Sequence, residues 1–318
     1  MKLATIIIIF FFFLTPITSK AQQDTVPGYK YNLSIISDND SYLLMGSDGY
    51  YTDGIYFNLN FIGKSVRKKI HTIEIGQLMY NAHSGDYELA SEIDRPVTAL
   101  LYAKYSQTIF SKNESVFEWN ILGGVLGPSA QGESLQKFIH KSIGAYQPTE
   151  WPFQLNQSIG ANTGLKWSPN IFSKFETNII AFKPIIKANA GSFFDNTNIG
   201  LLFQLGNFEK NSQSVLWQSR INRNNYLAKH PSESFFYFYP QFFYQLYNAT
   251  VQGGLFIKNK GPVTGVLNRY VFRQQFGWQY AKKRFSFSPS IIFDGRQAKE
   301  QQTPQWYGEI KIGYKFGK

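Results

Sequence analysis

The stretch YNLSIISDNDSYLLMGSDGYYTDGIYFNLNF, residues Tyr31–Phe61, decides the fold. It opens with a strand-like run, Tyr31–Ser37, passes through a polar loop, and ends with a second run, Ile55–Phe61, in which apolar and polar residues alternate. A period of two is typical of a β-strand with one apolar face. Acidic and hydroxyl residues therefore gather where two adjacent strands turn over, and such oxygen donors suit a hard cation such as Ca²⁺.

Alternating runs recur along the rest of the chain. The further strand candidates are Ile70–Tyr80, Val97–Phe110, Val116–Gly123, Gly160–Trp167, Phe175–Lys187, Asn198–Gln204, Ser214–Ile221, Phe235–Tyr247, Val251–Ile257, Val271–Ala281, Phe285–Phe293 and Tyr307–Phe316. The last run alternates apolar and polar residues, and the chain is 17% aromatic. Both features are typical of outer-membrane barrels with aromatic girdles, although the last run would also suit an edge strand of a soluble β-sandwich. We expect an all-β fold, a single transmembrane antiparallel β-barrel of roughly 12 strands.

The N-terminus indicates export. Lys2 is a short basic start, Leu3–Leu14 is an unbroken apolar run, and Ser19-Lys20-Ala21 fits a cleavage site of small residues. This run is too short for a spanning helix. We therefore expect a signal peptide over residues 1–21 and one outer-membrane barrel domain over residues 22–318.

Composition narrows the function. The chain has no cysteine, so disulfides, thiol nucleophiles and cysteine-ligated metals are excluded. Its formal net charge is +11, but it carries no nucleic-acid-binding motif, and no nucleic-acid partner is expected. Phosphates of anionic lipid or lipopolysaccharide are more natural partners for its surface Lys and Arg side chains.

One segment, Gly132–Ile143, predicts a short helix that ends at Gly144. Its apolar residues, Leu135, Phe138, Ile139 and Ile143, fall on one side, whereas Glu133, Gln136 and His140 fall on the other. Such a helix belongs either to a long loop or inside the lumen. If the N-terminus starts in the periplasm and the strands run up and down in order, several polar residues share the extracellular end: Asp40, Thr52, Asp94, Arg95 and His140.

Short polar motifs follow one another in order along the chain. They are Asn39-Asp40, Tyr51-Thr52-Asp53-Gly54, Gly76-Gln77 with Met79-Tyr80, Asp94-Arg95-Pro96 with Leu101-Tyr102, Gly127-Pro128-Ser129 with Gly132-Glu133, and Gln136 with His140. Over about residues 30–160 this series resembles the lipid A 3′-O-deacylase (LpxR-like) family of outer-membrane barrels. The chain departs from the family pattern at Val97-Thr98-Ala99, Asn81-Ala82 and Glu150-Trp151.

The resemblance implies a twelve-stranded barrel that hydrolyses ester-linked acyl chains at the 3′ position of lipid A, with Ca²⁺ assistance and a water activated by histidine. Carried over by motif, His140 is the expected general base. Asn39 and Asp40 are expected at the base and metal site, with Asp40 as a metal ligand, and Thr52 is expected to line the same site. A histidine near neutral pKa suits this role, and a bound cation can polarise an ester carbonyl.

Structural alternatives accompany these assignments. Asn39 and Asp40 also suit a simple turn, and Thr52 suits an ordinary strand. Arg95, Glu133 and Gln136 are secondary, substrate-side candidates. Arg95 would bind a lipid phosphate or pair with Asp94, and Glu133 would equally suit the first turn of a helix.

The expected function is therefore an outer-membrane lipid A deacylase whose active site faces the outer leaflet. Its expected partners are lipid A or lipopolysaccharide, the outer membrane, and the barrel-assembly machinery, which would read the C-terminal strand. A non-enzymatic porin or channel is one alternative. An esterase acting on phospholipid is the other.

Overall fold

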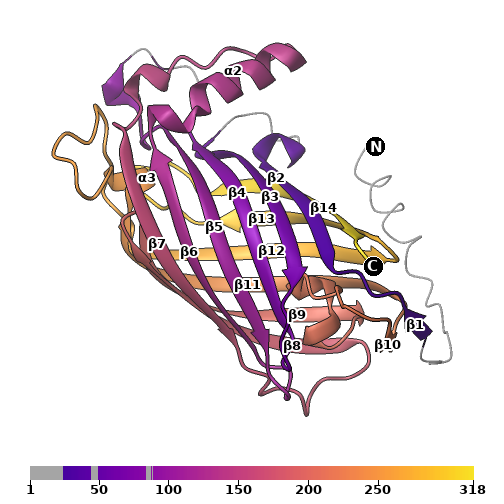
Figure 1. The fold of residues 1–318 in the computed structure, drawn as a ribbon. Helices are drawn as coiled ribbons and strands as arrows, with labels where there is room; N and C mark the ends of the chain where they lie inside the picture. The colour runs from indigo at the N-terminus through magenta and orange to yellow at the C-terminus, as the bar shows by residue number, and fades with distance from the viewer. Residues whose placement is uncertain (1–23, 44–48, 84–86, 88) are drawn as a thin grey trace, which may run out of the picture.

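The fold is a closed antiparallel barrel of twelve strands (Figure 1). The computed structural model describes residues 24–43, 49–83, 87 and 89–318. Neighbours in the chain pair with one another, β9 pairs with β11, and β14 pairs with β2 to close the barrel. The predicted fold class is confirmed, whereas the predicted signal peptide, residues 1–21, lies outside the described residues.

The barrel strands are β2 Tyr31–Asn39, β3 Tyr51–Ile62, β4 Lys69–Tyr80, β5 Thr98–Phe110, β6 Val116–Leu126, β7 Ser158–Ser168, β8 Ile180–Gly191, β9 Phe194–Asn207, β11 Ser232–Asn248, β12 Tyr270–Lys282, β13 Phe285–Asp294 and β14 Gln305–Phe316. A separate two-stranded sheet pairs β1 Asp24–Val26 with β10 Tyr226–Ala228. The helical elements are η1 Asp40–Leu43, η2 Ala90–Glu92, η3 Pro128–Ala130, α2 Gly132–Ile143, η4 Trp151–Phe153, η5 Asn211–Gln213, η6 Val215–Trp217 and α3 Ala249–Gln252. None of the helices within the described residues is long and apolar enough to cross a membrane.

Side chains alternate across the barrel wall as the sequence predicts. On β2, Leu33 and Ile35 point outward and are about half exposed, whereas Asn32 and Ser34 point inward and are buried. The outer face therefore carries an apolar band that suits lipid, and the polar backbone groups of each strand are satisfied by its neighbours.

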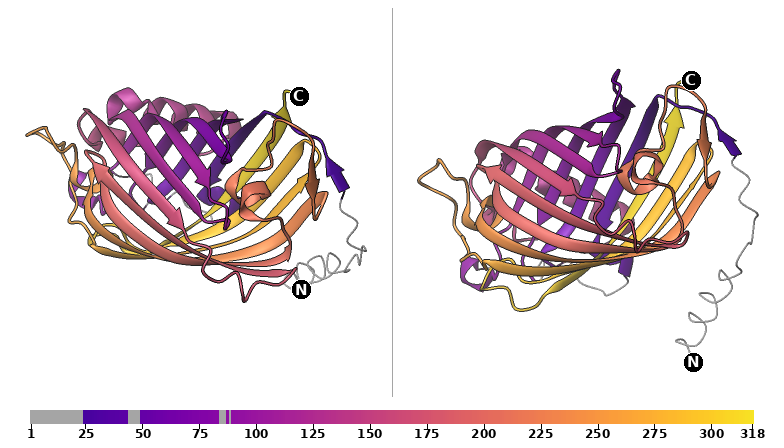
Figure 2. Two further views of the ribbon diagram at one scale, coloured as in Figure 1. Left: turned by 60° about the horizontal axis from the view of Figure 1, so that its bottom comes forward. Right: turned by 90° about the horizontal axis from the view of Figure 1, so that it is seen from below.

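The two ends of the barrel differ. One end carries α2 and the longer loops, and we call it the α2 end; the other carries β1 and β10, and we call it the β1 end (Figure 1). At the β1 end, the segment 208–231 between β9 and β11 folds across the barrel opening (Figure 2). Trp217 and Ile221 from this segment pack with Phe235 of the wall in the largest apolar cluster.

Two predicted strands are wrong. Ser214–Ile221 forms η6 and a turn, because its apolar residues fill the barrel opening instead of lining the wall. Val251–Ile257 lies in α3 and the loop after it, where Asn248 caps the helix by accepting a hydrogen bond from the Thr250 backbone N–H at 3.0 Å. A local apolar run does not distinguish these packings from a strand.

Helix α2 has the predicted bounds and ends at Gly144, whose φ of 73° suits glycine. Of the two predicted locations, the loop is right and the lumen is wrong. The helix starts against Ala99, which is paired with Met79 on the outer face of the wall. A Cβ on Gly132 would lie 2.5 Å from the Ala99 Cβ and 2.6 Å from the Trp151 ring, so only glycine allows this approach.

Candidate active site

A polar row on the outer face of the barrel forms the base of the candidate site. Asn39 of β2 is paired with Asp53 of β3, and Asp53 is paired with Met79 of β4. The Asn39 side-chain amide donates a hydrogen bond to the Asp53 carboxylate at 2.9 Å. Four residues closer to the β1 end, the equivalent outward row on the same strands contains Ile35, Phe57 and Ile75. Asn39 thus continues the lipid-facing side of its strand, at the α2 end.

Asp40 and Thr52 lie beside this row. Asp40 begins η1, and its carboxylate accepts a hydrogen bond from the Gly49 N–H at 2.9 Å. Thr52 is 1% exposed, and its hydroxyl has no hydrogen-bond partner within the described residues. It stands at a register shift in the pairing of β3 with β4, between Tyr51 and Asp53. A buried hydroxyl without a partner is costly, so this group is a candidate for contact with a ligand.

The donors in this region fit a hard cation by their chemistry. They are carboxylate, amide and hydroxyl oxygens, the ligand class that Ca²⁺ prefers. Within the part of the chain that the structure describes, His, Cys, Asp and Glu residues form no group of three that could hold a metal ion. Any Ca²⁺ bound beside Asp40 would therefore need further oxygen ligands, such as backbone carbonyls or water.

Gln136 ties α2 to the rest of the site. It is completely buried, and its side-chain oxygen accepts hydrogen bonds from the Trp151 indole N–H at 2.7 Å and the Asn81 amide at 3.2 Å. Asn81 also donates to the buried Glu150 carboxylate. Sequence reasoning identified Gln136 as a substrate-side candidate; these contacts give it a role in fixing the helix.

His140 projects from the same face of α2, one turn after Gln136, and is 6% exposed. Its ring Nδ1 lies 2.7 Å from the backbone carbonyl oxygen of Tyr146. A carbonyl oxygen only accepts hydrogen bonds, so Nδ1 must carry a proton in this contact. In the neutral ring the lone pair is then on Nε2, which is the tautomer that a general base needs.

Arg95 lies on the other side of the wall. Its guanidinium stacks 4.1 Å from the centre of the Tyr80 ring and donates to Thr250 at 3.0 Å and Gln297 at 3.3 Å. Burial lowers the pKa of this guanidinium to about 10. Asp94 accepts instead from the Tyr50 hydroxyl at 2.6 Å. Arg95 therefore joins three loops at the α2 end.

Glu133 is in the first turn of α2 and forms an ion pair with Lys137 at 2.6 Å, one turn later. Both side chains are exposed enough for water to screen the pair. These contacts agree with the structural alternative for Glu133, a first-turn acid that suits the helix dipole.

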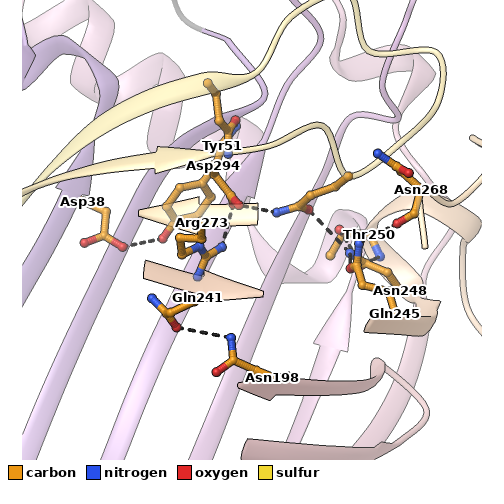
Figure 3. Close-up of polar contacts among 12 residues, drawn as sticks. Asp38, Tyr51, Asn198, Gln241, Gln245, Asn248, Thr250, Asn268, Arg273 and Asp294 are labelled. Carbon is orange, nitrogen blue, oxygen red and sulfur yellow. Dashed lines mark hydrogen bonds and ion pairs between the residues drawn. The ribbon is translucent and has the colours of Figure 1, made fainter. Parts of the chain in front are cut away.

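A second polar region lies inside the barrel, below the loops of the α2 end. A cavity of about 280 Å³ is lined by residues that include Asp38, Tyr51, Arg273 and Asp294. Tyr51 donates to Asp38 at 2.7 Å, and Arg273 pairs with Asp294 at 2.6 Å (Figure 3). Asp38 adjoins Asn39 in sequence, but strand alternation places the two side chains on opposite faces of the wall.

Sequence reasoning missed Asp53, Asn81, Glu150 and Trp151 as residues of the site. Asp53 could have been predicted from the sequence, because strand alternation from Phe57 places it on the outer face of the barrel. The contacts of Asn81 and Glu150 join segments 69 residues apart, and no local pattern reveals them.

Comparison with known proteins places the chain in a family. The family model described as outer membrane protein LpxR matches residues 6–316. The chain belongs to the LpxR family of outer-membrane proteins. The solved structure of LpxR from Salmonella typhimurium superposes with a TM-score of 0.72 at 20% identity, covering 90% of this chain and 100% of that one. This likeness agrees with the barrel fold, and the family description agrees with an outer-membrane location.

A second structure, the beta domain of the Bordetella autotransporter BrkA, has a TM-score of 0.47 at 10% identity and covers 92% of this chain and 100% of that one. A search of curated proteins found no match. The family membership therefore rests on the LpxR model, and the fold likeness on the Salmonella structure.

Proposed function

We propose that this LpxR family member is a lipid A 3′-O-deacylase of the outer membrane, with its α2 end at the extracellular surface. The observation that carries the proposal is the position of His140. A histidine with a protonated Nδ1 lies on a helix fixed at the rim of the outer wall, at the same end as Asn39, Asp53 and the buried Thr52 hydroxyl. An acyl ester in the outer leaflet can reach an outward-facing site without leaving the membrane.

In the proposed reaction, His140 Nε2 takes a proton from water, and the water oxygen bonds to the ester carbonyl carbon. The tetrahedral intermediate then breaks its bond to the 3′ oxygen, which takes the proton back from His140. The products are a free fatty acid and a lipid A with a 3′ hydroxyl. A Ca²⁺ held partly by Asp40 would supply stabilisation of the negative charge on the carbonyl oxygen.

The channel alternative is disfavoured by the segment 208–231. A channel needs a continuous polar lumen, whereas this segment places Trp217 and Ile221 in an apolar cluster at the β1 end. Arg220 of the segment also pairs with Glu233 of the wall at 3.1 Å, and both side chains are buried. The phospholipid alternative has the same chemistry at the ester and is separated by experiment.

The test is mass spectrometry of lipid A incubated with the purified, folded barrel, with Ca²⁺ or with a chelator. We expect loss of one 3′ acyl chain with Ca²⁺ only, and no loss for His140→Ala. His71→Ala is the matched control, because His71 bonds to Tyr105 on the wall, far along β4 from the α2 end. Activity retained by His140→Ala would exclude the proposed base, and cleavage of phospholipid alone would establish the second reading.

A further inference from the structure

Helix α2 has an unusual distribution of exposed side chains. It buries the polar residues Gln136 and His140, which are 0% and 6% exposed, and leaves Phe138 and Ile143 69% and 71% exposed. A surface helix of a water-soluble protein shows the opposite arrangement, with apolar residues toward the core. Phe138 and Ile143 therefore need an apolar environment outside the protein.

The apolar band of the barrel continues up to this helix. Ile73 and Ile75 of β4 point outward and are about half exposed. Higher on the same face of β4, Met79 belongs to the cluster against which Leu135 of α2 packs. Since α2 rests on the outer side of the wall, its apolar residues adjoin the surface that contacts acyl chains in an outer-membrane protein.

The positions of two lysine side chains on α2 also favour an environment of lipid. At about 100° per residue, the apolar residues of α2 from Phe138 to Ile143 span an arc of about 140°, and Lys137 and Lys141 lie roughly opposite the middle of that arc. Both are exposed, and Lys141 is in the last turn. A helix with an apolar side and an adjacent basic side is typical of the boundary between acyl chains and anionic headgroups, where lysine ammonium groups reach the phosphates.

We propose that α2 is an interfacial membrane helix, with Phe138 and Ile143 among the acyl chains of the leaflet and Lys137 and Lys141 at the phosphates. Its assignment to the outer leaflet rests on the proposed function. The helix would then set the depth of His140 relative to the bilayer, because His140 belongs to α2 and the buried contacts of Gln136 fix α2 to the barrel. The lipid leaflet would then cover the exposed apolar side of α2, and no further protein segment would be needed there.

The absence of cysteine permits a direct test. Single variants Phe138→Cys, Ile143→Cys and the control Lys137→Cys, on the basic side of α2, are spin-labelled in vesicles of phosphatidylethanolamine and phosphatidylglycerol. Collision with oxygen, which concentrates among acyl chains, is compared with collision with a water-soluble nickel chelate. We expect labels at positions 138 and 143 to favour oxygen several-fold more than the label at 137. Equal nickel accessibility at the three positions would overturn the proposal.

A second copy of the chain is the rival occupant of this surface. It would give dipolar coupling between labels at position 138 that grows with the protein-to-lipid ratio, and this result would also overturn the proposal. A second readout uses Phe138→Asp beside the control Phe138→Leu, which keeps an apolar side chain at this position. We expect Phe138→Asp to lower deacylation of bilayer-embedded lipid A several-fold more than that of detergent-dispersed lipid A. If the wild type deacylates nothing, the proposed function fails, but the collision data still decide the position of α2.

Discussion

Replacing Gln136 by leucine tests how α2 is fixed. The substitution introduces an apolar side chain of similar size and removes the acceptor for the Trp151 indole N–H at 2.7 Å and for Asn81 at 3.2 Å. A buried donor left without a partner costs about 1–3 kcal/mol, and the longer Asn81 contact adds less, because Asn81 keeps its bond to Glu150. We therefore expect the docking of α2 to weaken by about 2–3 kcal/mol.

This loss corresponds to a roughly 30- to 150-fold rise in the equilibrium constant for opening of α2. Hydrogen exchange of the α2 amides in the folded barrel measures it, since local opening is read separately from global unfolding. Lys137→Ala is the control, because its exposed ion pair with Glu133 is worth only about 0.5 kcal/mol. Unchanged exchange in Gln136→Leu, or an equal change in both variants, would refute the reasoning.

Three further predictions concern other parts of the chain. Thr52→Val removes a buried hydroxyl that has no partner in the described residues. Urea unfolding should therefore show equal or higher stability, whereas mass spectrometry should show at least a severalfold loss of deacylation. Full activity would make Thr52 purely structural. Glu233→Gln leaves the Arg220 charge buried and should destabilise the barrel by about 3–5 kcal/mol in urea, against no more than about 0.5 kcal/mol for Lys137→Met. Burial lowers the pKa of Lys68 to about 7, so above that pH the unfolded chain binds more protons than the folded barrel. The free energy of unfolding should therefore rise with pH from about 7 to about 10.5. Lys68→Met should flatten this rise.

Much of the wall could be predicted from the sequence, because the strand period of two is local. Alternation from Leu33 and Ile35 already places Asn39 on the apolar, outward side of β2, which is the position observed. The bounds of α2 also followed from local pattern and from Gly144. The segment Ser214–Ile221 did not, because its apolar residues pack against strands that are distant in sequence.

The site could be predicted less completely. Periodicity gave the two sides of α2 but not the side that faces the barrel, and here the polar side with Gln136 and His140 is buried. The usual expectation that a helix buries its apolar side predicts the wrong orientation for α2, because that expectation assumes that water surrounds the protein. The contacts of Arg95 with Thr250 and Gln297 join distant loops, so motif position alone could not reveal that this side chain lies over the lumen.

The register of the strands gives the height of the polar row in the membrane. Tyr31, paired with Phe61, lies near the β1 end, and Asn39, paired with Asp53, lies eight residues further along β2. At about 3.3 Å per residue and a tilt of about 40°, this spacing is about 20 Å along the membrane normal. The apolar band of such barrels is about 25 Å tall, so aromatic residues at one boundary place Asn39 near the other. Ester bonds of the leaflet lie at that boundary, so the proposed hydrolytic site on the outer wall would meet its substrate there, with α2 above it.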